Sequence, residues 1–135
     1  MVQVGDKIKG GFWDGFEVIS VYSRAQAIED GELVDVTELA QRRSFRYPVA
    51  VTASVWAWLE RAGTRVQFLG RSVGPEIIAM ELLLRLYQTI KALQGDTDRF
   101  DVRVSLAGQE LAVWALVGPG DDAEPVITVM LEGGD

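Results

Sequence analysis

The side chains available for chemistry in this sequence are carboxylates, lysines and hydroxyls, because its 135 residues include no histidine and no cysteine. Imidazole acid–base catalysis, thiol nucleophiles, disulfide scaffolds and zinc sites built on these ligands are therefore excluded. The segment Asp121, Asp122 and Glu124 offers oxygen ligands of the kind that Mg²⁺ and Ca²⁺ prefer, but it lacks the alternating spacing of a calcium-binding loop. We therefore expect a non-enzymatic protein with no catalytic residue, no metal and no cofactor. A Mg²⁺-dependent carboxylate enzyme is an alternative hypothesis.

The formal net charge of −7 is unevenly distributed along the chain. Residues 1–41 carry eight acidic and three basic side chains, and residues 104–135 carry six acidic side chains and no basic one. Dense negative charge attracts basic protein surfaces and repels nucleic acid. We therefore expect a protein partner with a basic surface and no direct nucleic-acid contact. The predicted partner-binding acidic face comprises Glu29, Asp30, Glu32, Asp35, Glu38, Asp121, Asp122 and Glu124.

The basic side chains gather in the middle of the chain, where residues 42–71 hold six arginines and one glutamate. Three of them, Arg42, Arg43 and Arg46, flank aromatic residues. Such a cluster can hold a phosphate backbone or a single strand. It is also typical of cations at the end of a helix, beside aromatic rings that enter the core. A DNA-binding regulator that uses these three arginines is thus the second functional hypothesis.

Apolar periodicity and capping residues predict the elements that must position these groups. A capping-box pattern at Ser23 and Gln26 predicts the start of the first helix, and Gly63 is expected to end a later one. Helices are expected over residues 24–30, 38–43, 53–62 and 75–94. Strands or extended segments are expected over residues 16–22, 33–36, 49–51, 65–69, 100–106, 109–117 and 126–131.

The last three strands predict an antiparallel meander, with a tight turn at Ala107-Gly108. We expect a single α+β domain over residues 1–135, with an antiparallel sheet made of this meander and strand 16–22. This sheet would pack on a long central helix, 75–94, and on the shorter helices. The apolar residues of helix 75–94 cover most of its circumference, which leaves a homodimer open. No membrane span or signal peptide is recognisable, so the expected location is the cytoplasm.

Three segments of the chain, Tyr22–Thr37, Phe45–Thr52 with the following Val55-Trp56, and Gly118–Thr128, resemble a family of small uncharacterised proteins carried by bacterial plasmids and integrative elements. Residues 63–100 depart from the pattern of that family. The resemblance implies no activity, but it implies the context of an accessory protein on mobile DNA. Such proteins often inhibit host defence, and a compact acidic domain can occupy the basic channels of nucleic-acid-handling machines. We therefore expect an anti-defence inhibitor, either anti-CRISPR or anti-restriction.

Overall fold

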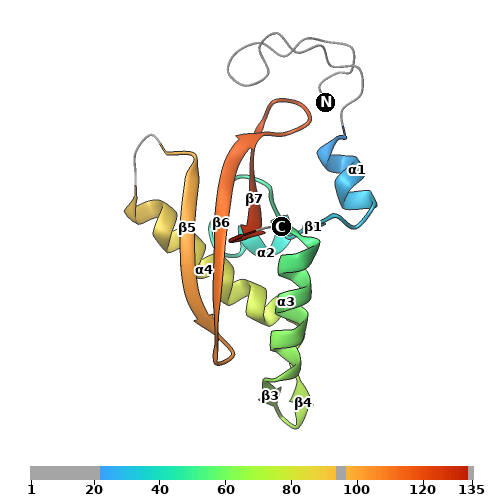
Figure 1. Ribbon diagram of the computed structural model, residues 1–135, viewed down its shortest axis with the longest axis vertical. Coiled ribbons are helices and arrows are strands. Elements are labelled where there is room, and N and C mark those ends of the chain that lie inside the picture. Colours follow the sequence, from blue (N-terminus) through green and yellow to red (C-terminus); the bar gives the residue numbers. More distant parts are fainter. Residues whose placement is uncertain (1–21, 94–96, 134–135) are drawn as a thin grey trace.

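The computed structural model describes residues 22–93 and 97–133, and the predicted strand over 16–22 lies, except for Tyr22, outside these residues. The described elements form one five-stranded sheet, a separate small hairpin and a set of helices (Figure 1). In chain order they are α1 (Arg24–Glu29), β1 (Leu33–Asp35), α2 (Thr37–Gln41), β2 (Val49–Thr52), α3 (Ala53–Thr64), β3 (Gln67–Phe68), β4 (Arg71–Ser72), α4 (Pro75–Ala92), β5 (Arg99–Leu106), β6 (Gln109–Pro119) and β7 (Pro125–Leu131).

The sheet has the strand order β1-β2-β7-β6-β5. The α+β class and the meander β5–β6–β7 are confirmed, since both pairs of the meander are antiparallel. The sheet is mixed and not antiparallel throughout, because β1 and β2 join the meander and β2 runs parallel to β7, with Val49 opposite Ile127. A parallel neighbour requires a long crossover connection. Here the chain supplies it by passing through α3, α4, β5 and β6 before it returns as β7.

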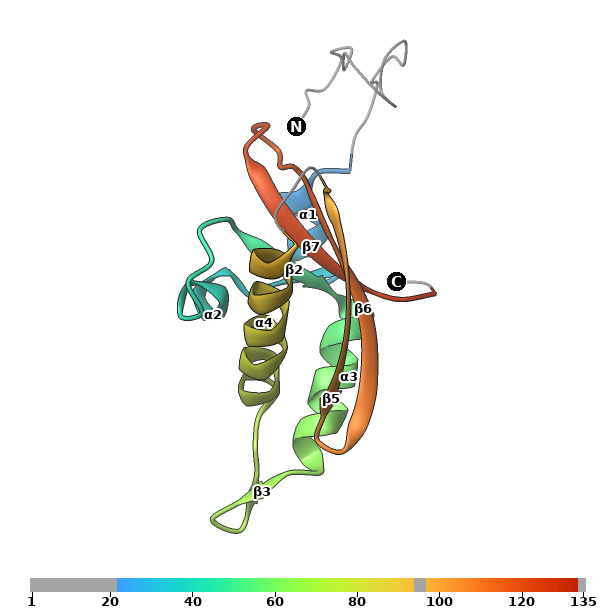
Figure 2. The ribbon, with the colours of Figure 1, turned by 90° about the vertical axis from the view of Figure 1, so that its left-hand side faces the viewer.

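Helices α3 and α4 lie side by side over one face of the sheet (Figure 2). The core between these layers includes Leu59 of α3, with Leu82 and Leu86 of α4, each at most 1% exposed. On β5 the buried residues alternate with exposed ones. The exposed residues of β5 therefore point to the opposite face of the sheet, away from α3 and α4.

Candidate interaction surface

The first helix and the turn before β7 meet, although they lie about a hundred residues apart in sequence. Helix α1 begins with the predicted capping box, in which Ser23 and Gln26 satisfy each other's backbone N–H groups. Asp121 adds a second cap: its Oδ1 accepts from the backbone N–H of Arg24 at 2.8 Å, and its Oδ2 accepts from that of Ala25 at 3.0 Å. The C-terminal acidic segment is thereby fixed on the N-terminus of α1.

These two hydrogen bonds determine the ionisation of Asp121. Burial of this carboxyl alone would raise its pKa, but the N–H groups of Arg24 and Ala25 stabilise the charged form, and the net result is a lowered pKa. A lowered pKa in the folded state means that the carboxylate stabilises the fold above the ordinary pKa of an aspartate. This contribution is lost as the pH falls through the lowered value.

Arg24 connects α1 to the sheet. Its Nη1 donates to Thr128 Oγ1 at 2.7 Å, and its Nη2 donates to the Ile127 carbonyl at 2.8 Å. Burial lowers the pKa of the guanidinium, whereas the charges of Asp35, Asp121 and Glu124 favour its ionised form. Arg24 thus collects carboxylates from β1 and from the turn before β7 around one partly buried cation.

The other end of α1 carries a second group of acidic side chains. The hydroxyl of Tyr22 donates to Asp30 Oδ2 at 2.7 Å. This hydrogen bond, followed by desolvation and by the charges of Asp30 and Glu32, raises the pKa of Tyr22 to about 12. Glu29 is the last residue of α1 and adjoins Asp30. We call the whole surface around α1 the acidic cap; it comprises Glu29, Asp30, Glu32, Asp35, Asp121, Asp122 and Glu124.

The acidic cap lacks ion pairs in the described part of the chain. The side-chain ion pairs among residues 22–93 and 97–133 join Arg85 to Glu81, Arg99 to Asp101 and Arg103 to Glu132. None of these acidic partners belongs to the cap. Glu38, the eighth residue of the predicted acidic face, lies in the first turn of α2, and no described contact links it to the cap. Seven of the eight predicted residues are therefore associated with α1 and its surroundings.

The three arginines of the second hypothesis have different environments. Arg43 packs toward α4, and its Nε donates to the Met80 carbonyl at 3.2 Å. Arg42 and Arg46 are exposed. The neighbouring Phe45 is buried and makes an edge-to-face contact with Tyr87, with 5.5 Å between the ring centroids.

Arg46 lines a groove of about 550 Å³ between the segment before β2, the end of α4 and the start of β5. Tyr47, Tyr87, Lys91 and Phe100 also line this groove. Two cations and several aromatic rings therefore face one depression, which is the chemistry that the second hypothesis requires of a nucleic-acid contact.

No described group of three or more acidic side chains has the arrangement of a metal site. In the turn before β7, Asp121 is directed at α1, and Glu124 Oε1 accepts from the backbone N–H of Asp122 at 2.9 Å. Among the described helices, none has the length and apolar character needed to cross a membrane.

Sequence reasoning missed Arg24, although a signal for it exists. It is the single basic residue between Lys9 and Arg42, within the acidic N-terminal segment. A lone arginine among carboxylates is a good candidate for their organising cation. Its contacts with Thr128 and Ile127 depend on the fold and could not be predicted from spacing.

Taken together, the fold and the acidic cap define a small α+β protein with a cluster of carboxylates outside its helix-on-sheet core, none of them in an ion pair with another described residue. The chain belongs to a family of unknown function, DUF6573, whose model matches residues 10–135. No curated protein and no solved structure matches the chain.

The hydrogen bond between Tyr22 and Asp30 gives a pH-dependent prediction. The phenol should ionise at about pH 12, above its ordinary value of 10.0. The raised pKa means that this contact stabilises the fold below the ordinary value and is lost as the pH rises through about 12. Ultraviolet absorbance of the phenolate measures the titration. Tyr22→Phe should remove this step, and Asp30→Asn should move it toward lower pH. An unchanged titration in Asp30→Asn would contradict the assignment.

Proposed function

We propose that this protein is a non-enzymatic interaction protein that binds a basic, nucleic-acid-handling protein surface through its acidic cap. The observation that carries the proposal is the meeting of two acidic segments around α1, where Asp121 accepts two backbone hydrogen bonds from the helix N-terminus. The seven cap carboxylates make no ion pair of their own within residues 22–93 and 97–133. Arg24 offsets part of the charge of Asp35, Asp121 and Glu124 without an ion pair to any of them. Carboxylates outside ion pairs on a fixed scaffold keep much of their negative potential available to a partner.

The partner class follows from the chemistry that recognises such a surface. Proteins that hold DNA or RNA do so in positively charged channels, and clustered carboxylates can replace phosphate there. The resemblance of three sequence segments to proteins of plasmids and integrative elements supports a role in the conflict between mobile DNA and its host. The proposed targets are therefore host defence nucleases, either RNA-guided effectors or restriction enzymes, which the protein would inhibit.

A charge-reversal experiment tests the role of the cap. Glu32→Lys/Asp122→Lys changes one residue of each acidic segment, and neither side chain makes a described hydrogen bond that the fold would lose. We expect the purified protein to inhibit DNA cleavage by at least one member of a panel of RNA-guided effectors and restriction enzymes. For that member, the double variant should bind about tenfold or more weakly, because reversed charges oppose the partner's cations.

The matched control is Glu60→Lys/Glu110→Lys, which makes the same change in net charge at exposed positions of α3 and β6. This variant should retain inhibition. Equal losses in both double variants would show that net charge acts instead of the cap. Inhibition of no panel member would reject the anti-defence function.

The groove beside Arg46 supports a second candidate function, a nucleic-acid-binding regulator. Lys91 and Tyr47 share this groove with Arg46, whereas Arg43 is engaged with the Met80 carbonyl. A gel shift with plasmid DNA at low salt separates the two candidates. Binding that weakens steeply with salt and is lost in Arg46→Glu/Lys91→Glu would favour the regulator, and no shift would favour the acidic cap.

A further inference from the structure

Strand β5 forms one end of the sheet, and within residues 22–93 and 97–133 its outer edge has no partner strand. It contains eight residues and pairs with β6 along its whole length, and it lies at the outer side of the sheet (Figure 1). No other described strand pairs with it. Proteins usually shorten, cover or charge such an edge, because its backbone groups offer a template to another chain.

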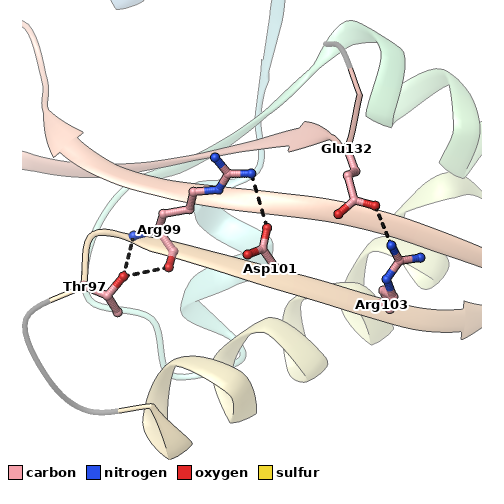
Figure 3. A network of polar contacts seen from close by, with 5 residues as sticks. All are labelled: Thr97, Arg99, Asp101, Arg103 and Glu132. Carbon is pink, nitrogen blue, oxygen red and sulfur yellow. Dashed lines mark hydrogen bonds and ion pairs between the residues drawn. The ribbon is translucent and has the colours of Figure 1, made fainter.

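The hydrogen-bonding pattern shows which backbone groups face outward. The N–H of Val117 donates to the Asp98 carbonyl at 2.8 Å, so the backbone N–H and C=O groups of Asp98 and, by alternation, of the even-numbered residues of β5 point toward β6. The backbone N–H and C=O groups of the odd-numbered residues point toward the open edge. Thr97 closes one end of this edge, since its Oγ1 accepts from the N–H of Arg99 at 3.2 Å and donates to the Arg99 carbonyl at 2.9 Å (Figure 3). The outward backbone groups of Asp101, Arg103 and Ser105 lie beyond this closed end.

We infer that the open edge of β5 pairs antiparallel with β5 of a second copy of this chain, so that the two sheets become continuous. A two-fold axis at Val102 places Asp101 opposite Arg103 of the second copy, and Arg103 opposite its Asp101. Both residues present outward N–H and C=O groups, so each of these pairs exchanges two backbone hydrogen bonds. Opposite charges directly across two strands add to this pairing.

The charges select this register over its neighbours. A shift of the axis by one residue along β5 places Asp101 opposite Asp101 of the second copy, or Arg103 opposite Arg103, and like charges in directly opposed positions are destabilising. In registers that place an odd-numbered residue opposite an even-numbered one, the backbone groups of the even-numbered residue point toward its own β6. They cannot bond to the second copy. The axis at Val102 therefore satisfies both the backbone and the side chains.

The surroundings of the edge are compatible with this arrangement. The side chains of Asp101 and Arg103 are exposed on the face of the sheet opposite to α4, and each makes only a surface ion pair, at 3.5 Å with Arg99 and at 2.7 Å with Glu132 (Figure 3). Exposed ion pairs of this kind contribute little to stability, so Asp101 and Arg103 can give them up to pair with a second copy at little cost. A groove of about 420 Å³ runs between α4 and the outer edge of β5, where it is lined by residues 101–104 together with Arg85, Gln88 and Thr89, so there is space beside the edge.

The experiment uses two charge variants of the full chain, separately and mixed, with sedimentation equilibrium as the readout. The unmodified protein should be a dimer. In Asp101→Arg, arginines face arginines across the axis, and in Arg103→Asp, aspartates face aspartates. Each variant alone should show a dimer dissociation constant about tenfold or more higher than that of the unmodified protein. An equimolar mixture should form a heterodimer, because every opposed pair then has opposite charges.

Two controls make the result specific to this edge. Glu60→Arg, on α3, should remain dimeric, and circular dichroism should show that each variant is folded. Glu32→Lys/Asp122→Lys should also remain dimeric. The dimer and the proposed inhibitory function can therefore be rejected independently of each other. A monomeric unmodified protein, a dimer that neither β5 variant weakens, or a mixture that stays monomeric would overturn the inference.

Discussion

Replacing Arg24 with methionine should lower the free energy of unfolding by about 3 kcal/mol. The guanidinium makes two hydrogen bonds to the sheet, to Thr128 Oγ1 and to the Ile127 carbonyl. Hydrogen bonds from a charged donor contribute about 1.5–3 kcal/mol each, and removal of the donor also leaves a partly buried carbonyl without its partner. Asp35, Asp121 and Glu124 would in addition repel one another without their shared cation. Chemical denaturation measures the difference.

Arg24→Lys is the informative control for this prediction. Lysine keeps the positive charge for the three carboxylates but lacks the planar fork that reaches two acceptors at once. We expect Arg24→Lys to lower the free energy of unfolding by less than Arg24→Met does. If both variants unfold at the denaturant concentration of the unmodified protein, the contacts of Arg24 do not hold α1 on the sheet. If both variants lower the free energy of unfolding equally, the hydrogen-bonding geometry of the guanidinium stabilises the fold and its positive charge does not.

The parts of the fold that could be predicted from sequence are those determined by near neighbours. The capping box at Ser23 and Gln26 and the tight turn at Ala107-Gly108 both occur as predicted. Each depends on side chains and backbone within four residues. The alternation of buried and exposed positions on β5 likewise follows from its own sequence.

The parts that could not be predicted depend on partners far along the chain. Nothing local to Val49–Thr52 indicates that β2 will pair parallel to β7, because that choice is made by the crossover through α3 and α4. The acidic cap shows the same limit. Charge counts identify two acidic segments in the sequence, but only the fold places Asp121 on the N-terminus of α1 and brings Arg24 near carboxylates of both segments.

Gly63 shows how a correct residue can be assigned an incorrect role. The sequence suggests a glycine that ends a helix, yet α3 continues through Gly63 to Thr64 and ends at the C-cap Arg65. Gly63 is buried, and a Cβ atom at this position would lie 2.6 Å from the Val73 carbonyl oxygen and 3.2 Å from the Gly74 carbonyl carbon. The position therefore requires glycine because the segment leading into α4 crosses α3 here at close range.

Gly63→Ala should accordingly lower the free energy of unfolding by about 2 kcal/mol, even though alanine is the better helix former by about 1 kcal/mol. The added methyl group would meet backbone atoms, which cannot rotate away as a side chain can, so α3 and the segment before α4 must separate. Gly118→Ala is the matched control, because a Cβ there would have no atom within 4 Å. Its unfolding free energy should stay equal or rise slightly. The two variants make the same chemical change, so opposite outcomes in chemical denaturation isolate the close approach at Gly63. A Gly63→Ala variant as stable as Gly118→Ala would show that α3 and the segment before α4 do not cross at this distance.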